Sequence, residues 1–372
     1  MDPIALRESI PALESGVYCN WGAAGPSPRQ VVEAAESALE HHEYDAPTAE
    51  GPYTAAFDAF DDARATVADF LEGSPDEIAL TESTTDGINR VAGAIDWNEG
   101  DVVVRTDLEH AAGVLPWQRL ERERGIDVRV LETEDGRLDL EEVAAVTAEA
   151  RLVCLSSLTW THGTRLPVAD VVEIAHEAGG LVLVDAVQGP GQVPVDVREW
   201  GADFVAGAGH KWLMGPFGSG FLFVRKGVVD EHDLVPQAIG YRSVDDANAD
   251  PYQYESGARR FEVGTSSPAP HAGLAAAIDL VEDVGLETIG SRIESLTDHL
   301  KDGLPEERLL SPLEFESGLV TIADDDPEAT VDRLAEEGIV IRSLPYPGAV
   351  RVSIHAVNTE AEVNRVLEVL AS

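Results

Sequence analysis

The sequence has few lysines, few cysteines and no long apolar run. Lysine occurs only three times among 372 residues, at Lys211, Lys226 and Lys301. The two cysteines, Cys19 and Cys154, provide neither a disulfide framework nor the spacing of a metal site. No apolar run approaches the ~20 residues of a membrane-spanning helix, and residues 1–8 lack a signal-peptide profile. We therefore expect a soluble protein of the reducing cytoplasm, with no metal site and no membrane partner.

Positive charge is scarce throughout the chain. Lysine and arginine together number 26 against 69 aspartates and glutamates, which gives a formal net charge of −43. Such a chain repels phosphate backbones and anionic lipids, so nucleic acid is a poor partner. Self-repulsion of this size destabilises a compact state unless salt screens it. The charge therefore predicts a halophilic protein from a cell that accumulates salt.

The first two thirds of the chain alternate short apolar runs with helical patterns. Strands are predicted at 78–81, 101–105, 128–131, 152–156, 181–185, 204–207 and 220–224. Helices are predicted between them at 84–94, 113–124, 140–148 and 168–178. This alternation favours an α/β fold with a mainly parallel, doubly wound sheet.

A second, smaller unit is predicted after an irregular, polar stretch at 230–260. Helices are expected at 268–284, 286–303, 327–337 and 359–370, and strands at 318–323, 339–343 and 350–354. The chain is long for a single hydrophobic core. We therefore predict a large domain at 17–255 and a small α+β C-terminal domain at 256–372, which residues 1–16 join.

Polar side chains follow several of the predicted strands, where ligands bind in open α/β sheets. Asp185 ends one strand, His110 follows another, and Thr84 and Thr85 begin a helix after a third. Lys211 is followed by Trp212, Leu213 and Met214. An apolar setting removes water from the amine, which lowers its pKa and favours the nucleophilic free base.

Together these residues suit pyridoxal 5′-phosphate (PLP). This cofactor needs a lysine for a Schiff base and a carboxylate beside its ring nitrogen. It also needs hydroxyl and N–H groups at a helix start for its phosphate, and it benefits from a flat side chain on the ring. We predict that Lys211, Asp185, Thr84 with Thr85, and His110 fill these roles.

Six motifs in order along the chain are similar to those of the class V aminotransferase family of fold-type I PLP-dependent enzymes. This family includes cysteine desulfurases, C–S lyases and isopenicillin N epimerase-like proteins. The motifs are Thr81–Asn89, Glu109–His110, Val184–Gln188, His210–Lys211, Arg260–Thr265, and Val350–Ser353 followed by Asn358–Glu360. The resemblance implies a fold-type I transferase whose large domain binds PLP.

The resemblance also implies roles for individual residues. Gln188 would lie near the ring oxygen and His210 would contact the phosphate. Thr265 would reach the phosphate of a neighbouring subunit, which implies a homodimer with shared active sites. Arg351 would clamp the substrate carboxylate, a bidentate task that suits a guanidinium group.

Some features depart from the desulfurase pattern. The stretch 342–349, where desulfurases carry the cysteine that accepts sulfur, contains no cysteine. Trp160 stands where desulfurases usually have an asparagine, and the loop Asn20–Gly25 looks like that of the C–S lyases. Asn20 and Trp160 are therefore expected to shape the substrate pocket. Arg342 is either a second anion contact or part of a structural ion pair.

We predict C–S bond cleavage in cysteine or cystine through a Schiff base on Lys211, which also serves as the general base, with Asp185 and His110 as catalytic partners. The alternatives are a class V aminotransferase, an amino-acid epimerase of the isopenicillin N epimerase-like branch, and a non-catalytic PLP-binding protein. The same active-site residues would serve C–S cleavage, transamination and epimerisation, so the sequence barely separates these three reactions.

The charge leads to a test of stability. Transfer from molar salt to low salt should unfold the chain, because 69 acidic groups then repel one another without screening. Circular dichroism across a salt titration measures this loss. A fold that is fully stable in low salt would disprove the halophilic interpretation.

Overall fold

A seven-stranded sheet forms the centre of the computed structural model, which describes residues 1–371. Its strand order is β2-β8-β7-β6-β5-β3-β4. The five strands β3 to β7 run parallel, and β8 is antiparallel to both of its neighbours. The strands are β2 Ile78–Thr81, β3 Val102–Thr106, β4 Asp127–Leu131, β5 Ala150–Ser156, β6 Leu181–Asp185, β7 Phe204–Ala208 and β8 Gly220–Val224. The predicted doubly wound α/β fold is therefore confirmed.

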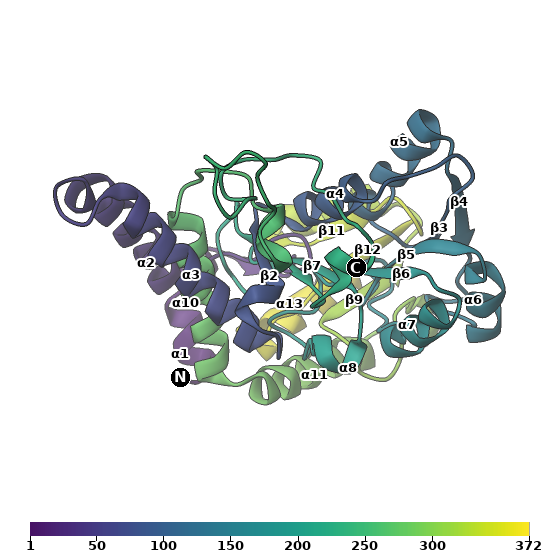
Figure 1. Cartoon of the computed structure of the whole chain (residues 1–372). Coiled ribbons are helices and arrows are strands. Elements are labelled where there is room, and N and C mark those ends of the chain that lie inside the picture. Colours follow the sequence, from purple (N-terminus) through teal and green to yellow (C-terminus); the bar gives the residue numbers. More distant parts are fainter. Residues whose placement is uncertain (372) are drawn as a thin grey trace.

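Helices cover both faces of this sheet, as Figure 1 shows. Their bounds are α2 Arg29–Glu40, α3 Pro52–Phe70, α4 Thr84–Ala94, α5 Leu115–Arg124, α6 Leu140–Thr147, α7 Val168–Glu177, α8 Val197–Trp200, α9 Val228–Glu231 and α10 Ala269–Val284. One core lies under α4 and α5, and the other lies under α3, α6, α7 and α10. Side chains alternate between these cores along each strand. On β6, for example, Leu183 faces the first core and Val184 the second. A strand that is buried on both faces in this way is apolar at every position.

The C-terminal part has its own small sheet and core. It contains an antiparallel sheet of order β11-β12-β9 and a parallel pair, β1 with β10. Its strands are β1 Val17–Tyr18, β9 Leu319–Ala323, β10 Ile339–Val340, β11 Arg342–Leu344 and β12 Ala349–Ser353, and its helices are α11 Leu286–Asp302, α12 Pro327–Glu336 and α13 Glu360–Leu370. The single strand predicted at 339–343 is thus wrong. Two short strands occupy this segment, and they pair with different partners.

Three sets of contacts tie the N-terminal segment, the C-terminal part and the large part of the chain together. Arg7, on α1 (Pro3–Glu8), pairs with Glu362 at 2.7 Å. Helix α11 spans two cores, with Ile293 in the large one and Leu300 in the small one. Helix α10 packs on α2 and α3 of the large part. The division of the chain at residue 256 stays a prediction.

Within residues 1–371, no helix combines the length and the apolar character needed to cross a membrane.

Candidate active site

One cavity of about 210 Å³ collects the side chains that follow the strands at the carboxyl edge of the large sheet. Its walls come from the loop before α2, the start of α4, the ends of β5 and β6, the loops after β3 and β7, and the small sheet. Most of the predicted site residues line it: Thr84, Thr85, His110, Trp160, Asp185, Gln188, His210, Lys211 and Arg351. The topology thus brings together residues that lie up to 267 positions apart in the sequence, from 84 to 351.

Lys211 lies in a tight turn after β7. The Met214 N–H donates to the Lys211 carbonyl oxygen at 3.0 Å, and the Gly25 N–H donates to the neighbouring His210 carbonyl at 2.7 Å. A Cβ atom on Gly25 would lie 2.1 Å from the Lys211 carbonyl oxygen, so only glycine fits there. Burial lowers the pKa of Lys211 to about 8, although Asp185 opposes this shift. The amine is therefore much closer to its nucleophilic form at neutral pH than an ordinary lysine.

Asp185 and Gln188 lie where β6 ends. The Val187 N–H donates to Asp185 Oδ1 at 3.0 Å, and burial raises the pKa of this carboxyl. Gln188 is held at both ends of its amide. Its Nε2 donates to the Gly22 carbonyl at 3.0 Å, and its Oε1 accepts from Trp212 Nε1 at 2.8 Å. Both side chains are thereby fixed against the floor of the cavity.

The start of α4 supplies an anion-binding end. Ser83 is the N-cap, and its hydroxyl accepts from the Asp86 N–H at 3.1 Å. The Thr84 hydroxyl is buried and has no hydrogen-bond partner among the described residues. The N–H groups of a first helical turn also lack intrahelical acceptors, and the helix dipole favours negative charge there. This end of the cavity can bind a phosphate group.

His110 presents a ring to the cavity after β3. It lies edge-on to Trp160, with ring centroids 5.5 Å apart. Burial, together with the positive charges of Lys211, Arg342 and Arg351, lowers its pKa. The imidazole is therefore neutral at pH 7, a state suited to stacking on an aromatic ring.

The preceding residue, Glu109, is buried directly behind this loop, and the sequence assigned it no separate role. Burial raises its pKa to about 7. Glu109 lies near Asp185 because it binds Ser156, which pairs with Asp185 between β5 and β6. The Glu-His dipeptide in the sequence does not reveal this pairing.

Arg351 and Arg342 face the cavity from the small sheet. They are cross-strand partners in β12 and β11. Arg351 is fully buried. Its Nη1 donates to the Trp160 carbonyl at 2.7 Å, while Nε and Nη2 have no partner within residues 1–371. Burial lowers its pKa to about 9. The guanidinium of Arg342 lies over the Trp160 ring at 5.7 Å and forms no ion pair in the described chain. Of the two roles left open for Arg342, this arrangement supports the anion contact.

Two predicted residues lie outside the cavity lining. The Asn20 carbonyl accepts from the Ala23 N–H at 2.9 Å, which shapes the turn that brings Gly22 and Ala23 to the cavity. Thr265 is exposed and lines a separate cavity of about 150 Å³. Within one chain, the structure therefore does not bring Thr265 to Lys211.

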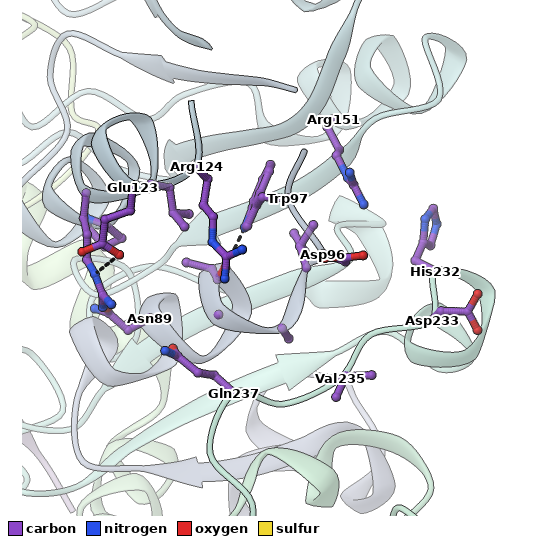
Figure 2. A pocket seen from close by; sticks show the side chains of 17 residues that line it. Asn89, Asp96, Trp97, Glu123, Arg124, Arg151, His232, Asp233, Val235 and Gln237 are labelled. Atoms are coloured by element: carbon purple, nitrogen blue, oxygen red, sulfur yellow. Dashed lines mark hydrogen bonds and ion pairs between the residues drawn. The ribbon is translucent and has the colours of Figure 1, made fainter. Parts of the chain in front are cut away.

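A larger hollow of about 570 Å³ lies between α4, α5 and residues 232–237 (Figure 2). Its arginines are partly neutralised. Arg119 pairs with Glu123 at 3.0 Å, and Arg151 pairs with Asp101. None of the predicted site residues lines it, so its size does not make it the reactive site.

The unpartnered groups of the Lys211 cavity fit PLP. The start of α4 with the free Thr84 hydroxyl suits the phosphate, Asp185 suits a protonated ring nitrogen, and Lys211 suits the aldehyde. The neutral ring of His110 and the fixed amide of Gln188 can border the cofactor ring. The fold and this cavity define a PLP-dependent enzyme of fold type I.

Comparison with known proteins identifies the family. The aminotransferase class-V family matches residues 17–366, and the chain belongs to this family. A probable cysteine desulfurase of Methanothermobacter thermautotrophicus is 36% identical, with 98% of this chain and 96% of that protein aligned. A cysteine desulfurase of Haloferax volcanii is 30% identical over 95% of this chain and 88% of its own length.

Solved structures show the same fold over nearly the whole chain. The apo cysteine desulfurase of Thermococcus onnurineus superposes with a TM-score of 0.91 at 30% identity, covering 100% of this chain and 97% of that one. The cystine C–S lyase C-DES, in complex with its product cysteine persulfide, superposes with a TM-score of 0.90 at 29% identity, covering 98% and 99% of the two chains.

The lowered pKa of Lys211 predicts how the apoprotein captures its cofactor. The rate at which the visible band of bound PLP appears should rise with pH up to about 8 and level off above it, because the free amine is the reacting form. Stopped-flow absorbance measures this rate. Lys211→Ala should show no band at any pH. A rate that still climbs tenfold per unit above pH 9 would contradict the assignment.

Proposed function

We propose that this enzyme cleaves the C–S bond of L-cystine by β-elimination, with pyruvate, ammonia and cysteine persulfide as products. Cysteine is the alternative substrate. The observation that supports cystine is the pair of arginines in the Lys211 cavity, neither of which has an anionic partner within residues 1–371. Cystine carries two carboxylates, whereas cysteine carries one. The related cystine lyase and cysteine desulfurases support C–S cleavage as the reaction type.

The proposed roles follow from the geometry. Arg351 binds the α-carboxylate through its free Nε and Nη2 atoms, while its bond to the Trp160 carbonyl fixes the guanidinium plane. Lys211 would hold the cofactor and would take the α-proton as general base. Asp185 would keep a proton on the ring nitrogen of the cofactor. When bound, PLP supplies the electron sink that accepts the negative charge left at the substrate Cα.

Arg342 is proposed to bind the distal carboxylate of cystine. It lies beside Arg351 across the β11–β12 ladder, so the two guanidinium groups face the cavity from neighbouring strands. Arg342 is half-buried, and this partial burial lowers its pKa and removes part of the water around it. A desolvated cation without a counter-ion is costly, and a substrate carboxylate would relieve that cost.

The cysteines do not support a persulfide relay within the chain. Cys19 and Cys154 are fully buried, and burial raises the pKa of both thiols. A sulfur acceptor needs an accessible thiolate beside the substrate. The turn between β11 and β12, at residues 345–348, has no cysteine. Sulfur would therefore leave with the product rather than on the enzyme.

We also propose that the chain works in the cytoplasm of a halophile as a homodimer. Thr265 is exposed and lines a cavity separate from the Lys211 cavity of its own chain. The family resemblance implies that Thr265 contacts a cofactor phosphate, so that phosphate would belong to the neighbouring subunit.

The subunit arrangement has a direct measurement. Sedimentation in molar salt should give twice the 39.8 kDa chain mass for the PLP-loaded enzyme. A fully loaded, active monomer would contradict the shared-site proposal.

The product of the reaction tests the proposed function. The PLP-loaded enzyme in high salt should convert L-cystine to pyruvate. Arg342→Gln should reduce kcat/KM for cystine roughly 10- to 100-fold, the equivalent of losing one charge-assisted hydrogen bond. For β-chloro-L-alanine, which has one carboxylate, the same variant should stay within about threefold of wild type. Product analysis by chromatography and coupled pyruvate assays measure both.

Several outcomes would overturn this proposal. Alanine as the three-carbon product would show desulfuration. Racemised or transaminated amino acid, without pyruvate, would favour the epimerase or aminotransferase alternatives. Equal reductions of kcat/KM for cystine and β-chloro-L-alanine in Arg342→Gln would show that Arg342 does not bind the second carboxylate. Arg351→Gln serves as the matched variant, because it should impair both substrates.

A further inference from the structure

The buried carboxyl groups of the described chain fall into two classes. Four of them form ion pairs with arginine: Glu77 with Arg198, Asp203 with Arg225 at 2.9 Å, Glu262 with Arg64 at 2.8 Å, and Glu362 with Arg7 at 2.7 Å. The other two, Glu109 and Asp185, have no cationic side chain in ion-pair contact within residues 1–371. Asp185 is the residue predicted to face the cofactor. Glu109 has no role in the chemistry described so far.

Glu109 is held by three donors rather than by a cation. Its Oε1 accepts from Thr106 Oγ1 at 2.7 Å and from the Ser156 N–H at 2.9 Å, and its Oε2 accepts from Ser156 Oγ at 2.7 Å. The Leu108 N–H donates to Thr106 Oγ1 at 3.2 Å, which directs the threonine proton to Glu109. A carboxylate accepts at both oxygens, whereas the protonated acid must donate at one. The Ser156 N–H keeps Oε1 an acceptor, and the charged form accepts from all three donors, while burial raises the pKa of Glu109 to about 7.

Glu109 lies one strand away from Asp185. Ser156, which binds both Glu109 oxygens, is the cross-strand partner of Asp185 in the β5–β6 ladder. Neighbouring strands are about 4.8 Å apart. The ionisable groups around this pair are Cys154 on β5, Arg105 on β3, and Lys211 after β7. Glu109 itself does not line the cavity.

Two buried carboxylates without counter-ions would destabilise the fold unless positive charge is brought to them. The cavity beside Asp185 is where the cofactor would place its protonated ring nitrogen and the cationic nitrogen bound to Lys211. Glu109 does not line this cavity, so it would act through Asp185 and through the local electrostatic potential.

We propose that Glu109 is a positioning residue, a second buried carboxylate whose negative charge behind Asp185 favours the protonated state of bound PLP. The inference concerns this chain's residues and the cofactor. It does not depend on which substrate the enzyme cleaves.

The test is a pH titration of the visible band of the PLP-loaded enzyme without substrate. Glu109→Gln keeps the size of the side chain and can keep its bonds to Ser156, but it removes the charge. The midpoint at which the protonated form of the bound cofactor is lost should fall, by at most about one pH unit, because an opposite charge within about 4–6 Å shifts a pKa by one unit or more and Glu109 acts from behind Asp185. Measuring this without substrate separates it from failure of the proposed cystine cleavage.

Glu77→Gln is the matched control. It removes a buried glutamate charge far from the cavity, where Arg198 is the partner, and it should lower stability without moving the midpoint. If Glu109→Gln does not fold, Thr106→Val removes one donor to Glu109 and should shift the midpoint in the same direction by a smaller amount.

An unchanged midpoint in a folded, PLP-loaded Glu109→Gln enzyme would overturn the proposal. So would an equal shift in Glu77→Gln, because that would reduce the role of Glu109 to general stability. A downward shift confined to the Glu109 and Thr106 variants would support it.

Discussion

The site depends on one constraint, the burial of charged side chains at the carboxyl edge of the large sheet. Lys211, Asp185 and Glu109 lie at this edge, and Arg351 faces it from the small sheet. The other buried carboxylates of the described chain are neutralised by arginine. Buried charges are tolerated when they are paired or hydrogen-bonded. Here several of these groups lack partners among the described residues. The phosphate and the cationic ring of the cofactor, together with a substrate carboxylate, would supply them.

The rest of the fold holds these groups in place. The parallel strands β3, β5, β6 and β7 end at one edge, so that the loops after them meet there. The small sheet brings Arg351 and Arg342 to the same cavity, and the turn at Gly22 and Gly25 closes it against Lys211. Close packing at these glycines leaves no room for a side chain.

Local patterns predicted the elements of the large sheet well. The strands at 78–81, 181–185 and 220–224 and the helix at 84–94 match the structure, because their apolar runs are bounded by glycine or by a helix N-cap. The segment 339–343 was mistaken for one strand. Its apolar residues are continuous, but the chain changes partner between Val340 and Arg342, and local periodicity contains no information about that change.

The sequence by itself determined the class of fold and the cofactor, and it predicted which lysine would bind that cofactor, since each depends on short motifs and on residue chemistry that is local along the chain. The tertiary structure decided three further matters. It put Arg342 beside Arg351, it put Glu109 one strand behind Asp185, and it left Thr265 outside the Lys211 cavity. These depend on strand order and register, which set how far apart two charges lie, and Coulomb interactions in a buried site depend on that distance.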